Sequence, residues 1–274
     1  MDSDDAIFGQ HPLRWLVEQA RMRELDATPV VAPESSMEHV GAVNDLDAAY
    51  ASGAGVRLQP RSWPSVDRAA LDGLLEVLVM AEPDIDLFLE LGESSGPIAE
   101  RAAIAEVNAV AAAHDFRSIS VGVSAFPDLA GVARGVSEFS RSDLEVFLTV
   151  RDEVNVEIGF ADTAIQRADQ VDLGVDPKLL TISAVLRYTT ADHWLIAKGG
   201  LFKASGGRSE GGAALVPALD LLVGHSEYRT PFGTEADDWI DQVRASSASP
   251  GNPQTWRKWG TLRHLRVTAS QLAT

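Results

Sequence analysis

Six short apolar segments, about thirty residues apart with helical patterns between them, limit the folds open to this chain more than any other feature. The segments are Thr28–Ala32, Val56–Gln59, Asp84–Leu91, Ser118–Val123, Val154–Phe160 and Leu180–Tyr188. Apolar residues at helical spacing predict a helix between each pair of segments. Alternating strands and helices are typical of a parallel sheet, because a right-handed crossover returns the chain in the same direction.

The length of 274 residues suits one (β/α) barrel, which needs roughly 250 residues. We therefore expect an α/β protein with a TIM-barrel-like parallel (β/α) barrel, as a single domain over residues 1–274. A strand at His193–Lys198 is expected to run back beside the sixth segment as a hairpin. Six glycines within residues 199–212 predict a loop, and residues 213–274 are expected to form a helical C-terminal part of the same domain.

Composition limits the partners and the compartment. The net charge of −17 makes binding to bulk nucleic acid or to anionic membranes unfavourable. No apolar run approaches the ~18 residues of a membrane span, and the acidic start MDSDDAIFG lacks the regions of a signal peptide. The absence of cysteine excludes disulfides and thiolate metal sites. These features predict a cytoplasmic protein.

Charge is unevenly spread along the chain. Residues 255–274 carry Arg257, Lys258, Arg263 and Arg266 and no acidic residue. One interpretation is the solvated end of a basic helix, and the other is a tail that faces an anion.

Polar residues at the carboxyl ends of the apolar segments are the candidates for a site, since barrel sites form at that face. They are Arg57, Glu90, Glu93, Ser124, Asp162, Arg187 and Lys198. Glu90 interrupts an apolar run, so it needs a partner. It is either half of a structural ion pair with Arg57 or a general acid/base with a shifted pKa.

The remaining candidates have alternatives of their own. Asp162 either caps a turn or joins Glu90 as a second catalytic carboxylate. Arg187 and Lys198 lie on opposite arms of the hairpin, where they either pair with surface carboxylates or face an anion.

The glycine-rich stretch occupies the place where many barrels hold phosphate. Its backbone N–H groups, with Lys198, Lys203 and Arg208, could cradle an anion, although the spacing matches no phosphate-loop motif and also suits a floppy loop.

Several chemistries find no support in the sequence. The six histidines are scattered, which predicts no metal site, and no Gly-x-Ser-x-Gly elbow is present. The pattern points to no particular cofactor.

Several motifs resemble the Beta protein family, known from tailed bacteriophages and bacterial genomes. The motifs are residues 185–199 (VLRYTTADHWLIAKG), Ser124–Pro127, Gly159–Ile165, His225–Tyr228, Thr255–Arg257 and His264. The match runs from about Thr28 to the C-terminus. The family favours a Trp-Gly-Asp-like turn where this chain has Phe232–Asp237, so the resemblance assigns Asp237 no role.

The resemblance implies a barrel and a phage or anti-phage context, but no particular reaction. Because the family begins with two strands before the first helix here, we expect this barrel to lack its first two strands and to leave a sheet edge near Val30. The hairpin arm, the N-terminal tail or a second subunit is then expected to cover that edge.

Two functions follow. The first is a binding or accessory protein with a protein partner. The alternative is a barrel enzyme for a phosphorylated or nucleotide-like ligand, with Glu90 and Asp162 as catalytic carboxylates and Arg57, Arg187, Lys198 and Lys203 as anion contacts. Whether the protein is an enzyme stays open at this point.

Overall fold

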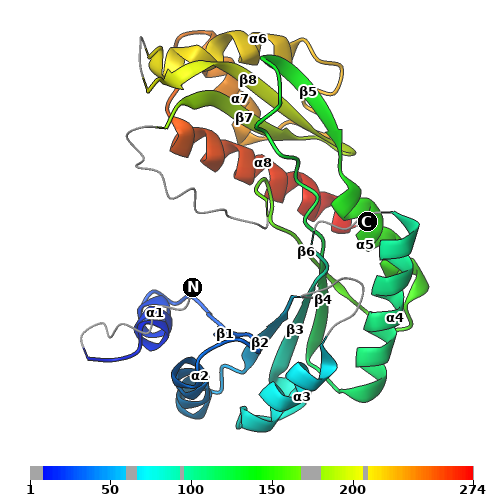
Figure 1. Cartoon of the computed structure of the whole chain (residues 1–274). Coiled ribbons are helices and arrows are strands. Elements are labelled where there is room, and N and C mark those ends of the chain that lie inside the picture. Colours follow the sequence, from blue (N-terminus) through cyan, green and yellow to red (C-terminus); the bar gives the residue numbers. More distant parts are fainter. Residues whose placement is uncertain (1–8, 60–66, 93–95, 168–179, 206–208, 274) are drawn as a thin grey trace. The chain divides into compact units, whose positions relative to one another are not determined.

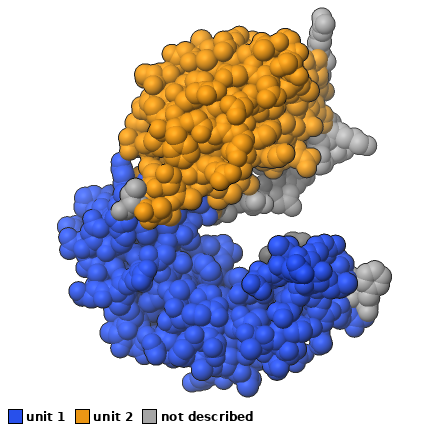
Figure 2. Space-filling view, turned by 180° about the vertical axis from the view of Figure 1, so that it is seen from behind, with its two compact units in different colours: residues 1–124, 143–162 blue, residues 125–142, 163–274 orange. Residues whose placement is uncertain are grey.

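The computed structural model describes residues 9–59, 67–92, 96–167, 180–205 and 209–273. The chain divides into two compact units, which Figure 2 colours separately. Unit 1 comprises residues 1–124 and 143–162, and unit 2 comprises residues 125–142 and 163–274. The chain therefore passes from one unit to the other three times. A single domain over residues 1–274 stays a prediction.

Unit 1 is built on a parallel sheet with the strand order β1-β2-β3-β4-β6 (Figure 1). Its elements are α1 (Pro12–Arg21), β1 (Val30–Val31), α2 (Met37–Tyr50), β2 (Ala54–Leu58), α3 (Arg68–Val77), the 3-10 helix η1 (Glu82–Asp84), β3 (Ile85–Glu90), α4 (Pro97–Ala113), β4 (Ser118–Gly122), β6 (Gly159–Ala161) and, apart from its first residue, α5 (Ser142–Glu153). All four pairings are parallel, which confirms the first five segments of the predicted sheet.

Local sequence explains these elements. In β3, Ile85, Leu87 and Leu89 are buried and alternate with half-buried residues, as a strand with one apolar face requires. The hydroxyl of Ser36 accepts a hydrogen bond from the backbone N–H of His39 and so caps α2. Figure 1 shows α2, α3 and α4 along one side of the sheet, where successive right-handed crossovers place them.

The sixth predicted strand does not belong to this sheet. It forms β7 (Ile182–Thr189), which pairs antiparallel with β8 (His193–Lys203) in a separate sheet. The prediction of six parallel strands is therefore wrong for the last one. Apolar periodicity identifies a strand but does not set its direction or its partner, which explains the error. The described residues form no closed barrel.

Unit 2 contains a three-stranded antiparallel sheet with the order β5-β8-β7. Its elements are β5 (Gly135–Ser140), β7, β8, the 3-10 helix η3 (Gly211–Leu215), α6 (Val216–Val223), α7 (Glu235–Arg244) and α8 (Pro253–Leu272). The predicted hairpin of β7 and β8 is confirmed. Strand β5 comes from the segment between β4 and α5, where the sequence predicted no strand.

The two faces of this sheet bury different residues. Leu186, Leu195 and Ala197 face a core that includes residues of α6 and α7 together with Trp256 of α8. Trp194 and Ile196 point to the opposite face, where they pack with Phe126. Neighbouring residues of β8 point to opposite faces of the sheet. Each face therefore presents its own set of β8 side chains.

The glycine-rich stretch is partly strand. β8 continues through Gly199 and Gly200 to Lys203, so the predicted loop begins later than expected. A Cβ atom at Gly199 would collide with the backbone carbonyl of Ala214, and glycine therefore allows the η3 backbone to approach β8 closely.

Strand β1 stands at one end of the order of the parallel sheet, next to β2. Val30 is 43% exposed, and the ring Nε2 of His39 lies 2.9 Å from the carbonyl oxygen of Val30. The hairpin arm does not cover this edge as one alternative proposed, because β8 pairs with β5 and β7. The acidic N-terminal tail, another alternative, lies mostly outside the described residues. None of the described helices is both long enough and apolar enough to cross a membrane.

Candidate functional site

The residues predicted to form one site fall into two groups. Arg57, Glu90 and Asp162 belong to unit 1. Arg187, Lys198 and Lys203 belong to unit 2.

In unit 1, Arg57 and Glu90 form a two-pronged ion pair between neighbouring parallel strands. Arg57 donates from Nε to Oε1 of Glu90 at 2.6 Å and from Nη2 to Oε2 at 2.8 Å. Gln59 donates a third hydrogen bond to Oε2 at 2.7 Å. Hydrogen bonding to Glu90 raises the pKa of Arg57. The pairing agrees with the structural interpretation of Glu90, since both carboxylate oxygens are already occupied.

Asp162 follows β6, two places from β3 in the strand order. Its side chain is half-buried. No contact that joins it to Glu90 is present among the described residues. Glu93 lies outside the described residues. The two-carboxylate hypothesis gains no support from unit 1.

Unit 2 contains a pocket of about 750 Å³ that includes two of the predicted anion contacts, Arg187 and Lys198. Its lining residues are Phe126, Pro127, Asp128, Leu129, Ala130, Gln166, Arg167, Leu180, Thr181, Ile182, Ser183, Val185, Arg187, Lys198, Pro253, Trp256 and Arg257. Four of these residues are cationic and only Asp128 is acidic. The lining is therefore net positive, although the whole chain carries a net charge of −17.

Arg187 is the half-buried cation of the pocket. Its Nη1 donates to the carbonyl oxygen of Ile165 at 3.0 Å, and its guanidinium carbon lies 5.3 Å from the ring centre of Phe126. Burial lowers the pKa of Arg187, and the nearby positive charge of Arg257 lowers it further. No acidic group among the described residues offsets these two effects. Two cations held together in this way favour an anion between them.

Lys198 has a different task. Its ammonium group donates to the carbonyl oxygens of Val132 at 2.6 Å and Leu129 at 3.3 Å. These hydrogen bonds hold the segment before β5 against β8. An ammonium group has three donors, which leaves one for a ligand. Asp128 lies 3.7 Å from Arg167 and offsets that cation.

Only part of the predicted glycine-rich cradle lies within the described residues. Lys203 lies at the end of β8, outside the lining of the pocket. The backbone N–H of Leu201 donates to the carboxylate of Glu210 at 3.2 Å. The carboxylate of Glu210 therefore already accepts from a backbone N–H group that an anion could otherwise use. Arg208 lies outside the described residues.

The basic residues of the C-terminal segment lie in different surroundings, and no single interpretation fits them all. Arg257 lines the pocket, whereas Arg266 forms an exposed pair with Glu235. Arg263 is 0% exposed and donates to Oδ2 of Asp237 at 2.7 Å.

Asp237, to which the sequence gave no role, is the centre of this buried network. It also accepts hydrogen bonds from the hydroxyl of Tyr188 at 2.6 Å and from the backbone N–H of Thr234 at 2.6 Å. Burial lowers the pKa of Arg263 and raises the pKa of Tyr188. The network is enclosed and fully paired, which is typical of a structural role.

Sequence reasoning assigned no ligand contact to three lining residues that precede β5 or lie on α8, namely Phe126, Asp128 and Trp256, and named Arg257 only as part of a basic segment. The basic run on α8 was the available signal for Arg257. It also missed the group Glu138, His193 and Glu227, the one set of described histidine and acidic residues whose ligand atoms all lie within 4.8 Å of one another.

Comparison with known proteins gives one result. The family model described as Beta protein matches residues 1–269, so the chain belongs to the Beta protein family. No curated protein matches the chain, and no solved structure does.

Proposed function

We propose that this member of the Beta protein family is a binding or accessory protein whose unit 2 pocket takes a small phosphorylated or nucleotide-like anion. The observation that carries the proposal is the lining of the pocket, in which the cationic residues Arg167, Arg187, Lys198 and Arg257 outnumber the single acidic residue Asp128. Cations that line one pocket repel each other, and an anion that contacts them offsets this repulsion. Guanidinium groups also match the flat, two-oxygen face of a phosphate.

The apolar part of the pocket favours a ligand with a ring. Phe126 and Trp256 line the same pocket as the arginines. Both rings are almost fully buried, with 4% and 2% of their surface exposed, so they form an apolar wall, while the guanidinium planes can stack with a flat heterocycle. Ser183 and Gln166 offer polar groups for orientation. A phosphate with an attached base therefore uses more of this pocket than phosphate alone.

Catalysis has less support. The alternative of a barrel enzyme needs Glu90 as a working carboxylate, but Arg57 and Gln59 occupy both of its oxygens. A binding role requires no such group. The phage or anti-phage setting, with a protein partner, rests on the family alone.

Isothermal titration of the full chain with ADP, ATP and inorganic phosphate tests the proposal. We expect one saturable site for a nucleotide, with affinity that falls as salt rises, because charged hydrogen bonds dominate. Replacing Arg187 with Met is expected to weaken binding by at least about tenfold, the equivalent of one lost charged hydrogen bond. Replacing Arg257 with Gln is expected to weaken it less, because Arg257 is exposed.

Arg244→Gln is the matched control, since Arg244 also belongs to unit 2 but pairs with Asp220 outside the pocket. It should bind as the wild type does. The proposal fails if none of the three anions binds, or if R187M keeps wild-type affinity while remaining folded.

A further inference from the structure

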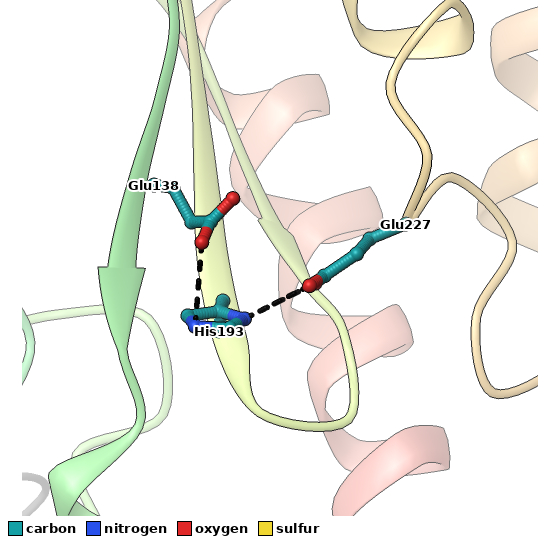
Figure 3. Close-up of side chains that lie close together, drawn as sticks. All are labelled: Glu138, His193 and Glu227. Carbon is teal, nitrogen blue, oxygen red and sulfur yellow. Dashed lines mark hydrogen bonds and ion pairs between the residues drawn. The ribbon is translucent and has the colours of Figure 1, made fainter.

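Three side chains from separate parts of unit 2 meet around one imidazole ring. His193 begins β8, Glu138 lies on β5, and Glu227 lies in the segment between α6 and α7. Figure 3 shows His193 between the two carboxylates. Its Nε2 lies 3.3 Å from Oε1 of Glu138, and its Nδ1 lies 3.0 Å from Oε1 of Glu227. No function considered so far uses this group.

The group is on the opposite face of the sheet from the pocket. His193 has the same parity along β8 as Leu195, and Glu138 lies opposite Leu195 in the β5–β8 register. Lys198, which lines the pocket, has the other parity. Because neighbouring residues of a strand point to opposite faces, the two sites are separate.

The two carboxylates place negative charge around His193. Nδ1 of His193 is within hydrogen-bonding distance of Oε1 of Glu227, at 3.0 Å, whereas Nε2 and Glu138 lie 3.3 Å apart as an ion pair. A neutral imidazole carries a proton on only one ring nitrogen, so its other nitrogen has a lone pair for a cation.

Polar neighbours fix both carboxylates in place. Oε2 of Glu227 accepts from the hydroxyl of Thr190 at 2.6 Å and also lies 3.2 Å from Nδ1 of His193. Oε2 of Glu138 lies 3.5 Å from Nε2 of His225. Nδ1 of His225 accepts from the backbone N–H of Glu227 at 3.2 Å, so His225 turns its Nε2–H toward Glu138. Such outer contacts orient the side chains of metal sites.

We propose that Glu138, His193 and Glu227 bind a divalent transition-metal ion of the Zn²⁺ or Mn²⁺ type. One ligand atom from each residue lies within 4.8 Å of the other two. The carboxylates lie nearest different ring nitrogens, so the exposed Glu138 side chain must rotate toward the nitrogen that faces Glu227 for all three to share one ion with bonds of ~2.0–2.2 Å. An imidazole ligand beside two carboxylates suits Zn²⁺ best and is also accepted by Mn²⁺, whereas Mg²⁺ prefers oxygen alone. Glu138 is 46% exposed, which leaves water access to the remaining coordination positions.

The chain supplies its own comparison in unit 1. His114 also lies between two carboxylates, 3.0 Å from Glu82 and 3.6 Å from Asp72. These three side chains do not bring their ligand atoms together as the group in unit 2 does. They therefore test whether convergence on one point, rather than a histidine flanked by acids, creates the metal site.

The experiment is calorimetric titration of the full chain, stripped of metal with a chelator, with ZnCl₂, MnCl₂ and MgCl₂. We expect one Zn²⁺ or Mn²⁺ per chain, a rise in melting temperature on binding, and much weaker binding of Mg²⁺. Glu138→Gln and His193→Gln are each expected to weaken binding by at least about tenfold. His114→Gln should leave the affinity unchanged.

The proposal is overturned if wild-type protein binds neither transition metal. It is also overturned if E138Q binds as tightly as the wild type, or if H114Q weakens binding as much as H193Q. E138Q decides the matter if H193Q does not fold, because Glu138 is a surface residue of β5. Nucleotide binding is measured separately, so either proposal can fail alone.

Discussion

The two units differ in the exposure of the ion pairs that connect their elements. Unit 1 keeps its cross-strand ion pairs at the surface: the side chains of Arg57 and Glu90 are 46% and 29% exposed. Unit 2 encloses the pair of Arg263 and Asp237 completely. Water screens the first kind of pair, so breaking it costs little. Breaking the second kind leaves a charge without water or a partner. Stability should therefore depend on single charges far more in unit 2.

The largest expected effect comes from Arg263→Met. It leaves the carboxylate of Asp237 buried without its counter-charge, which costs about 3–5 kcal/mol of unfolding free energy. Guanidinium unfolding followed by tryptophan fluorescence measures it, since Trp239 and Trp256 belong to the core of unit 2. Arg266→Met on the same helix is the control and should cost below about 1 kcal/mol, because its pair with Glu235 is exposed. Equal losses of unfolding free energy in the two variants would contradict the difference between buried and exposed ion pairs.

The second effect appears in alkali. Burial raises the pKa of Tyr228 from its usual 10.0 to about 12. The folded state therefore holds this proton more tightly than the unfolded state. The stability that this difference contributes is fully present below pH 10 and is lost as the pH rises toward 12. Tyr228→Phe should cost about 1 kcal/mol at neutral pH through lost hydrogen bonds and should flatten the alkaline loss. Melting curves between pH 8 and pH 12, as an approximate range, measure both.

A third, smaller effect appears in acid and belongs to unit 1. The hydrogen bonds from Arg117 are the main cause that holds the pKa of Asp86 below its usual value, and Ser118 adds to it. A depressed pKa contributes stability above the unfolded value of 3.8, and this stability is lost as the pH falls through the folded value. Asp86→Asn should lower stability at neutral pH by below about 1 kcal/mol and reduce the acid dependence. An unchanged acid profile in D86N would contradict this assignment.

The smallest effect is expected for Glu90→Gln. Gln keeps an acceptor for Arg57 while losing the charge, so the cost should be below about 0.5 kcal/mol for a partly exposed pair. Chemical unfolding followed by far-ultraviolet circular dichroism measures it. A loss of several kcal/mol would mean that this pair is as costly to break as the buried pair of unit 2.

The same contrast explains what could be predicted from the sequence. The parallel sheet of unit 1 follows from local periodicity, because each strand is followed by the helix that returns the chain to its neighbour. β5 gave no such signal, since none of its residues is buried. β7 carried a clear apolar pattern, and its hairpin with β8 was predicted correctly, but that pattern did not exclude β7 from the parallel sheet.

The candidate site was predictable in part for a similar reason. Arg187 and Lys198 stood out because they interrupt apolar strands, and both line the pocket. Lys203 was predicted from the glycine-rich stretch and lies outside the lining of the pocket. Arg57 and Glu90 were also recognisable, and their ion pair is the structural alternative given for them. Glu138, His193 and Glu227 are far apart in the sequence, and only the antiparallel register of β5 and β8 brings the first two together.

The placement of β5 also has a consequence for the order of events on the ribosome. β5 ends at Ser140, but the strand that pairs with it ends at Lys203. At roughly 5–20 residues per second, about sixty residues take several seconds to synthesise. During this interval β5 has been synthesised but its pairing strand β8 has not. The strands of unit 1 up to β4 are already complete. Nascent chains are thus exposed to mispairing at this strand until the hairpin emerges.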